Sequence, residues 1–532
     1  MSADRPEQAE EAVPEDDPLW KQRLKDAVLG LSLANLVLAN AWFEILYDKD
    51  RGYFNEVPVK TPTLLALMVN LAWLTGVAWL VMRVWRSTRN RAVRFAIHLL
   101  FLAALIFPVD FLRTNLLKIP DYQVVVFLKH PTGVALTAIL LLLVIWQHRR
   151  VARFAAVVVV LFAPLALLTV AHTVLLLVGV LHLNQDDADP PLAALRPARP
   201  DLPRVIWIIF DETDYRLAFE QRPAGVALPN FDQLRRESLF ATNAYSPGGA
   251  TLISMPALIS GQQLDSVKVA GPSELLIEPE KSKQKLDWRR LPSVFSLARD
   301  AGANTALVGW YHPYSRILAG SLSYCVWFPY MTSEHARAGT VGPALARELS
   351  AMLGTIQRRQ LYVDLCRRGE REATALAGNA DYNLMLFHLA PPHKPGIYLP
   401  ADHRFTAFGV PKSMGYFNNL MLADRMLGAI RQSVVHAGLQ DKTWLVISSD
   451  HWWRESAVYD GRVDCRVPFI VHPPRSGQGL EFGTMINTIV THDLLLAILR
   501  GELHTVADTA RWLEPRRIAR PPNYRQQKES TD

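Results

Sequence analysis

Residues 204–213 read RVIWIIFDET, a stretch in which an apolar run ends abruptly at Asp211 and Glu212. A short apolar run bounded by polar residues is typical of a strand buried on both faces. Ligands of open α/β sheets bind beyond the carboxyl ends of such strands. The two acidic residues therefore stand where a sheet would present them to a ligand. Acidic helix caps are also common after a strand, so this pair alone favours the cap.

Four further runs of the same kind follow, and amphipathic stretches separate them. The runs are NTALVG (304–309), YNLMLFHL (382–389), TWLVISS (443–449) and VPFIVH (467–472). The stretches 230–239 and 418–438 between them have helical periodicity. Alternating strands and helices predict an α/β fold with a mainly parallel sheet covered by helices on both faces. We expect this soluble domain to span residues 204–502.

Acids and histidines stand at the ends of several of these runs. TWLVISS leads into Asp450 and His451, NTALVG leads to His312, and YNLMLFHL contains His388 and leads to His393. Carboxylates and imidazoles that meet at one sheet edge form a site suited to zinc or to another divalent cation such as Mn, Mg or Ca. Several such strand ends in one domain are much harder to explain as helix caps.

A candidate nucleophile lies in SPGGATLISMPALISG, residues 246–261. Its two glycines allow close approach of the backbone to an anion, and a helix is expected to begin near Thr251. A hydroxyl at a helix N-terminus beside a metal can lose its proton and attack phosphorus or sulfur. The alternative is that Thr251 caps the helix and Ser254 lies inside its first turn, and this segment alone favours that alternative.

The first third of the chain has a different character. Residues 1–25 form an expected disordered cytoplasmic N-terminus, and five apolar stretches follow at about 26–47, 62–85, 92–112, 131–147 and 152–183. A span needs about 20 helical residues, so residues 26–183 are expected to form a transmembrane domain of about five helices. A Pro- and Asp-rich linker (184–203) and a C-terminal tail (503–532), disordered from Pro515, complete the predicted organisation.

The distribution of basic residues predicts the orientation of these spans. Arginines crowd the second and fourth loops, at Arg83, Arg86, Arg89, Arg91 and Arg94 and at Arg149, Arg150 and Arg153. The positive-inside rule then places the N-terminus inside and, with five spans, the soluble domain outside the cytoplasm. The net charge of +7 is explained by these loops and gives little support to nucleic-acid binding. Three cysteines form no disulfide framework.

Taken together, the motifs resemble the alkaline phosphatase/sulfatase superfamily over nearly the whole soluble domain. The membrane-anchored branch, with lipid A phosphoethanolamine transferases and lipoteichoic acid synthases, is most similar, and it likewise places five spans before an exported catalytic domain. The resemblance implies an α/β/α sandwich fold. It also implies a multi-pass protein of a bacterial-type inner membrane.

Roles for individual residues follow from the same resemblance. It implies metal binding by Glu212, with Asp211 as a possible second ligand, and by Asp450 and His451 of the Ser-Asp-His motif. Thr251, in a Thr-x-x-Ser-x-Pro pattern, matches the nucleophile, and His393 matches a histidine that faces the substrate or a second metal. Substrate-binding positions are implied at His312, His388 and Asn418.

Three departures from the family pattern bear on activity. Trp452 and Trp453 follow the Ser-Asp-His motif, where family members have glycine. Trp310 replaces the lysine of the sulfatase Gly-Lys-x-His motif. No histidine lies between His451 and the 467–472 run, which places a second metal in doubt.

The sequence therefore predicts a membrane-bound, metal-dependent phospho-group transferase or phosphodiesterase that acts on a membrane lipid or envelope glycan through Thr251. One alternative is a sulfate-ester hydrolase, against which counts the absence of an arginine two residues after Pro256. The other is a catalytically inactive protein that keeps the fold. The residues leave the substrate, the oligomeric state and the choice between transfer and hydrolysis open.

Overall fold

The computed structural model describes residues 18–47, 51–54, 61–117, 119, 124, 127–128, 130–181, 190–330, 340–350, 355–407, 410, 412–474 and 477–530. The chain divides into two compact units. Unit 1 comprises Met1–Tyr47, Lys60–His182 and Ala338–Met352, and unit 2 comprises Asp48–Val59, Leu183–Arg337 and Leu353–Asp532. Each unit thus contains a short segment that is flanked in the chain by residues of the other unit.

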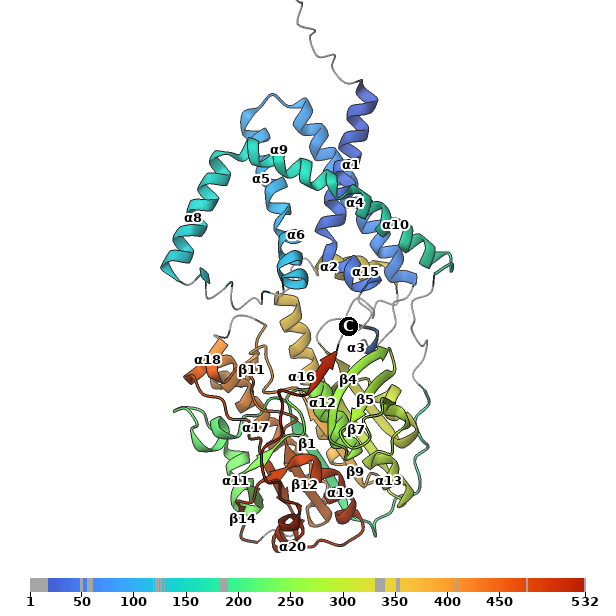
Figure 1. Ribbon diagram of the computed structural model, residues 1–532, viewed down its shortest axis with the longest axis vertical. Coiled ribbons are helices and arrows are strands. Elements are labelled where there is room, and N and C mark those ends of the chain that lie inside the picture. The colour runs from blue at the N-terminus through green and yellow to red at the C-terminus, as the bar shows by residue number, and fades with distance from the viewer. Residues whose placement is uncertain are drawn as a thin grey trace, which may run out of the picture. The chain divides into compact units, whose positions relative to one another are not determined.

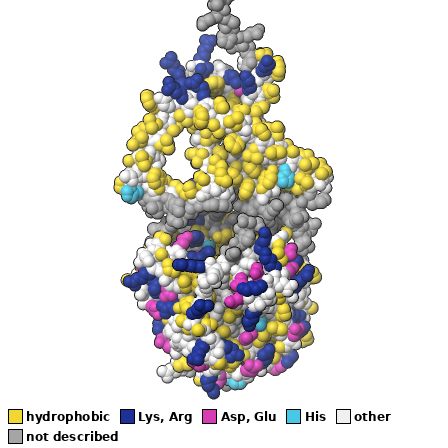
Figure 2. All heavy atoms as spheres, viewed as in Figure 1, with side chains coloured by type: hydrophobic (Ala, Val, Ile, Leu, Met, Phe, Trp, Pro, Cys, Tyr) yellow, Lys and Arg dark blue, Asp and Glu magenta, His cyan; other side chains and the backbone are white. Residues whose placement is uncertain are grey.

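Unit 1 is a set of apolar helices (Figure 1). They are α1 (Leu19–Val37), α2 (Ala39–Leu46), α4 (Thr61–Ser87), α5 (Arg91–Ala104), α6 (Ile106–Phe111), α8 (Pro131–Trp146), α9 (His148–Leu161) and α10 (Ala163–Leu177). Figure 2 shows hydrophobic side chains over most of their visible surface, with Lys and Arg gathered at one end. Exposed apolar surface of this extent suits contact with lipid.

The described residues test the prediction of about five membrane spans only in part. By length and composition, Thr61–Ser87 and Arg91–Leu116 each suffice to cross a membrane. Two helix pairs qualify only together: α1 with α2, bent by 68°, and α8 with α9, bent by 90°. The described residues therefore contain two candidate spans, or four if each bent pair counts as one, whereas α10 has only 15 residues.

The bend between α8 and α9 has a chemical cause in the sequence. Helix α9 begins with HRRVAR, residues 148–153. Burying these cations in a bilayer is costly, so the polypeptide turns where they begin rather than continuing as one straight apolar helix. Helix α9, which contains the first part of the predicted fifth span (152–183), therefore forms a bent pair with α8, the predicted fourth span.

Unit 1 also contains α15 (Val341–Ser350), which comes from within the range predicted for the soluble domain. It packs against α4. The Asn70 amide donates to Glu348 Oε2 at 2.9 Å and to the Leu345 carbonyl at 3.3 Å.

Unit 2 is built on an eight-stranded mixed sheet with strand order β14-β2-β13-β12-β1-β9-β7-β8. The bounds are β1 (Arg204–Phe210), β2 (Leu239–Ala241), β7 (Thr305–Tyr311), β8 (Tyr324–Pro329), β9 (Leu384–Leu389), β12 (Thr443–Ser448), β13 (Phe469–His472) and β14 (Leu480–Phe482). All five predicted strands are present. Strands β12, β1, β9, β7 and β8 are mutually parallel, and only β13 pairs antiparallel with β12 and β2.

Helices cover both faces of this sheet, as predicted. Alternate residues of β1 enter two separate cores: Val205, Trp207 and Ile209 join one, and Ile206 and Ile208 join the other. The first core includes α12 (Thr251–Ser260), α13 (Val294–Asp300) and α19 (Thr491–Leu499). The second includes α11 (Pro229–Glu237), α16 (Thr355–Ala377) and α17 (Lys412–His436). Unit 2 is therefore an α/β/α sandwich.

The C-terminal tail, expected to be disordered from Pro515, packs on unit 2 over its described part. Strand β16 (Lys528–Ser530) pairs with β4 (Leu264–Gly271) in a second sheet that also holds β5 (Glu274–Pro279) and β6 (Leu286–Asp287). Tyr524 donates to the Ser246 carbonyl at 2.9 Å and its ring lies 4.5 Å from that of Trp452. An aromatic contact and backbone hydrogen bonds thus order a segment whose composition alone favours disorder.

Candidate active site

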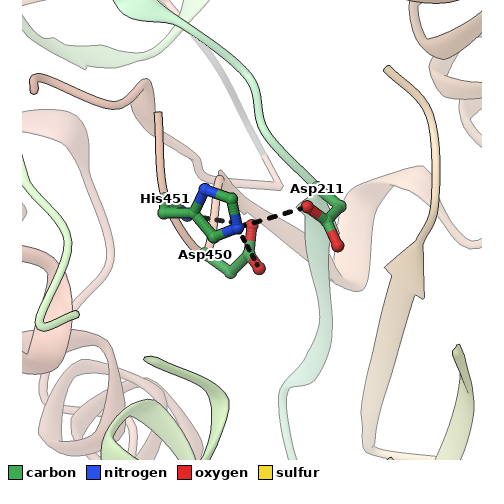
Figure 3. A group of neighbouring side chains, drawn as sticks. All are labelled: Asp211, Asp450 and His451. Carbon is green, nitrogen blue, oxygen red and sulfur yellow. Dashed lines mark hydrogen bonds and ion pairs between the residues drawn. The ribbon is translucent and has the colours of Figure 1, made fainter. Parts of the chain in front are cut away.

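Three side chains converge at the carboxyl ends of β1 and β12. Asp211 follows β1, and Asp450 and His451 follow β12, its parallel neighbour. Their ligand atoms all lie within 4.8 Å of one another, and all three residues are buried (Figure 3). His451 Nε2 lies 3.6 Å from Asp211 Oδ1 and 3.6 Å from Asp450 Oδ2. We call these three residues the acidic cluster.

The backbone beneath the cluster is fixed by Ser449. Its hydroxyl accepts from the Thr213 amide at 2.8 Å and lies 2.7 Å from the carbonyl of Phe210. The ends of β1 and β12 are thereby joined by a buried hydroxyl. The two contacts of the Ser449 hydroxyl fix the separation of Asp211 from Asp450.

Glu212 lies next to the cluster but faces another partner. Its Oε1 is 3.6 Å from Arg454 Nε, and it is not among the three residues whose ligand atoms converge. Its backbone has φ 63°, a left-handed conformation that a residue with a Cβ seldom adopts. Strain of this kind persists only where surrounding structure holds it and is frequent at functional sites.

Tyr416 on α17 supports that strained turn. Its hydroxyl donates to the Glu212 carbonyl at 2.9 Å and accepts from the Asp214 amide at 2.9 Å. The ring stacks on Trp453 with centroids 3.9 Å apart and planes 5° from parallel. Trp453, one of the departures from the family pattern, therefore packs behind the site.

Thr251 is the first residue of α12 and points into the acidic cluster. Its hydroxyl donates to Asp450 Oδ2 at 2.7 Å and lies 3.3 Å from Asp211 Oδ2 and 3.4 Å from His451 Nε2. Ala250 is the N-cap, so the Thr251 hydroxyl caps no helix. Ser254 is turned away, and its hydroxyl donates to the Gly248 carbonyl at 2.9 Å. This geometry favours Thr251 over Ser254 as nucleophile.

The electrostatics of the cluster fit a bound divalent cation. His451 Nδ1 donates to the Trp452 carbonyl at 2.8 Å, and burial lowers the pKa of His451, so Nε2 presents a lone pair to two carboxylates. Burial and the nearby charge of Asp450 raise the pKa of Asp211, whose Oδ1 is buried without a hydrogen-bond partner. A bound cation would neutralise such a set of buried negative atoms. Asp211, Asp450 and His451 would hold that ion.

Two histidines lie at the ends of the neighbouring strands: His388 is the penultimate residue of β9, and His312 follows β7. His388 Nε2 is 3.9 Å from Asp211 Oδ2 and has no hydrogen-bond partner among the described residues, and its Nδ1 lies 2.9 Å from the Tyr314 hydroxyl. His312 Nε2 lies 3.2 Å from the Thr251 carbonyl and its Nδ1 lies 2.8 Å from the Tyr53 hydroxyl. Burial lowers the pKa of His388 to about 4 and that of His312 to about 3. Both rings are neutral at neutral pH.

The remaining predicted site residues make other contacts. His393 Nδ1 lies 2.6 Å from the Lys394 carbonyl, and its ring packs 5.2 Å from that of Trp310, which replaces the family lysine. The Asn418 amide donates to the Tyr398 carbonyl at 2.9 Å, a structural bond that explains its burial without a substrate. Asp424, a buried carboxylate on the same helix as Asn418, accepts from the Phe231 amide at the start of α11. The roles of His393 and Asn418 stay predictions.

Three residues at the site had no signal in the sequence. Tyr53, Tyr314 and Tyr416 each place a hydroxyl on a site residue or on its backbone. A tyrosine is a common core residue, and no spacing distinguishes these three from the other tyrosines of the chain. Only the tertiary structure reveals them.

Comparisons with known proteins give structural matches only. No protein-family model matches the sequence, and no curated protein matches it. The crystal structure of Ps i-CgsB with k-i-k-neocarrahexaose matches with a TM-score of 0.43 and 16% identity, over 57% of this chain and 73% of that chain. A protein of the alkaline phosphatase superfamily from Vibrio parahaemolyticus gives 0.38 and 14%, over 58% and 68%. The lipoteichoic acid synthase LtaP from Listeria monocytogenes gives 0.37 and 14%, over 57% and 72%. Members of the alkaline phosphatase superfamily are thus among the structures that resemble this chain, at scores too low to indicate an activity.

Proposed function

We propose that this chain is a membrane-bound, metal-dependent enzyme that transfers or hydrolyses a phospho group carried by a membrane lipid or envelope glycan. One observation carries the proposal: the Thr251 hydroxyl lies within hydrogen-bond distance of Asp450 inside a buried Asp-Asp-His cluster, at the N-terminus of α12. The hydroxyl can attack an anionic ester, a cation bound beside it would activate it, and the helix N-terminus stabilises negative charge that develops there.

The residues divide the work in the following way. A divalent cation held by Asp211, Asp450 and His451 would act as a Lewis acid, lowering the pKa of an adjacent hydroxyl. Asp450 Oδ2 accepts a hydrogen bond from the Thr251 hydroxyl and so orients the oxygen. The Thr251 oxygen then forms a bond to phosphorus as the bond to the leaving oxygen breaks, and the Thr251 proton leaves by way of Asp450 Oδ2 to the leaving oxygen or to solvent. An acceptor hydroxyl or water afterwards attacks phosphorus, and its proton restores the Thr251 hydroxyl as the bond from phosphorus to the Thr251 oxygen breaks.

The contacts of Ser254 weigh against the sulfatase alternative. Formation of formylglycine at that position would place the aldehyde where the Ser254 hydroxyl now bonds to Gly248. The Gly248 backbone packs closely on this turn, because a Cβ there would lie 2.8 Å from Ser254 Oγ and from Ile253 Cγ2. Thr251 therefore serves as an unmodified alcohol in this proposal.

The test compares Thr251→Ala with its matched control Ser254→Ala in the full chain. Thr251→Ala should lower turnover of a chromogenic phosphodiester by about 10³-fold or more, since it removes the hydroxyl that bonds to Asp450 Oδ2. Ser254→Ala should retain a substantial part. Mass spectrometry of enzyme trapped with substrate should find a phospho adduct on the Thr251 peptide. Preference for the matching sulfate ester, or formylglycine at Ser254, would shift the assignment to a sulfatase.

We further propose that unit 2 lies outside the cytoplasm. The turn between α4 and α5 and the start of α9 carry the arginines that favour the cytoplasmic side. The orientation therefore requires the chain to cross the membrane once more after Arg153, as the predicted fifth span (152–183) does. A reporter fused after Asp532 should be active only if it functions outside the cytoplasm. Activity of a cytoplasm-only reporter at the same position would reverse this orientation.

A further inference from the structure

His312 holds the segment that carries the nucleophile. It lies directly after β7, where Tyr311 adopts φ 77°, a left-handed conformation at the strand end. The imidazole is fully buried and reaches the backbone carbonyl of Thr251 at 3.2 Å. A carbonyl only accepts hydrogen bonds, so His312 Nε2 carries the proton and donates it.

That assignment fixes the role of Tyr53. A neutral imidazole with its proton on Nε2 has a lone pair on Nδ1. The Tyr53 hydroxyl lies 2.8 Å from this Nδ1 and therefore donates to it. A chain of two hydrogen bonds runs from Tyr53 through His312 to Thr251. Because both ring nitrogens have protein partners, His312 supports the nucleophile rather than contacting substrate in this conformation.

Tyr53 comes from a distant part of the chain. It belongs to α3 (Arg51–Phe54), between α2 and α4, yet the segment Asp48–Val59 is part of unit 2. Tyr53 is completely buried in the core that also contains Leu252 and Ile253 of α12. Phe54 beside it packs against Tyr311, with ring centroids 5.1 Å apart. Two adjacent aromatic residues thus insert this segment into unit 2.

We infer that Tyr53 is a positioning residue for the nucleophile: the segment between the first two apolar stretches completes the catalytic unit by fixing His312, which holds the first turn of α12. This inference rests on the proposed function for its catalytic consequence, and on geometry alone for its effect on α12. It implies that residues 204–502, the range predicted for the soluble domain, lack one component of the site.

The experiment uses the full chain with Tyr53→Phe, which removes one hydroxyl and keeps the ring. The matched control is Tyr324→Phe, which removes a tyrosine hydroxyl bonded to Glu372 at 3.0 Å on the edge strand β8. Two quantities are measured: kcat and KM for a chromogenic phosphodiester, and amide hydrogen exchange of a peptide covering residues 248–255. We expect Tyr53→Phe to lower kcat about tenfold with KM within about twofold, and to speed exchange in that peptide. Tyr324→Phe should change neither.

The two measurements separate this inference from the proposed function. If the wild-type chain turns over no phosphodiester, the proposed function fails, and the exchange data still decide whether Tyr53 orders α12. Unchanged exchange at 248–255, unchanged kcat, or faster exchange throughout unit 2 with a lowered unfolding midpoint would each overturn the inference. The last result would make Tyr53 an ordinary core residue.

Discussion

The candidate active site lies along one edge of the central sheet, and the two pairs of strands that form this edge carry different kinds of side chain. At the ends of β1 and β12 lie Asp211, Asp450 and His451, whose buried charges and lone pairs face one another. At the ends of β9 and β7 lie His388 and His312, and each has its Nδ1 against a tyrosine hydroxyl. The first half is acidic, and Asp211 Oδ1 has no hydrogen-bond partner among the described residues. The second half is neutral, and tyrosine hydroxyls hold its two histidines.

This difference indicates a division of labour around Thr251. In the proposed function the acidic half holds a cation, so its residues would contribute chemistry directly. The histidine half is kept uncharged by burial, which lowers both pKa values. Its residues contribute position. Substitutions in the two halves should therefore differ in kind and in size: loss of metal and of nearly all turnover in one, and a moderate loss of kcat with metal retained in the other.

The largest effect is expected from removing the cation ligands. Asp450→Asn together with His451→Ala takes away two of the three converging ligands, so metal affinity should fall more than about 100-fold and turnover should nearly vanish. Elemental analysis of the purified full chain measures the metal content. Asp424→Asn is the matched control, because Asp424 is a buried carboxylate that caps α11. Full metal occupancy in the double variant would mean that the site lies elsewhere.

A smaller effect is expected where the acidic half is held by its backbone. Tyr416→Phe removes the hydroxyl that bonds to both the Glu212 carbonyl and the Asp214 amide but keeps the stacking on Trp453. We expect kcat to fall about tenfold and the free energy of unfolding to fall by about 1–2 kcal/mol, since a strained turn loses two buried hydrogen bonds. Denaturant titration and steady-state kinetics measure both. Tyr459→Phe is the control, because Tyr459 is more exposed and packs against Phe417, the neighbour of Tyr416 in the chain. It should change neither quantity.

The sequence predicted the parts of this fold that local pattern determines. The strands of the central sheet are continuous apolar runs because they are buried on both faces, and such runs are visible in the chain itself. The cluster residues Asp211, Asp450 and His451 were found because parallel strands bring their carboxyl ends to one edge. The clustering of Thr251 with them follows from helix α12 beginning at that edge.

What the sequence could not predict depends on distant contacts. Tyr53 and His312 are 259 residues apart, and nothing in the sequence around Tyr53 indicates insertion into another unit. The tail was expected to be disordered because it is basic and contains prolines, yet Tyr524 reaches the Ser246 carbonyl, 278 residues away. The bends in α1–α2 and α8–α9 reduced the number of candidate spans, since hydropathy measures the length of an apolar run and not its straightness.

The smallest effect should come from the hydroxyl that supports His388. Tyr314→Phe removes the hydroxyl that contacts His388 Nδ1. His388 itself stays in place, because it belongs to β9, whose register against β1 is fixed by backbone pairing. His388 Nε2 lies 3.9 Å from Asp211 and makes no hydrogen bond to the nucleophile segment, so we expect kcat to fall only about threefold and metal content to stay the same. Parallel kinetics of Tyr314→Phe and Tyr53→Phe measure the ratio. His312 holds Thr251 directly and His388 does not, so the loss should be greater for Tyr53→Phe. A greater loss of kcat in Tyr314→Phe than in Tyr53→Phe, or loss of metal in Tyr314→Phe, would mean that His388 acts as a ligand with the acidic half. The acidic half would then include the end of β9, and only His312 after β7 would remain in the other half.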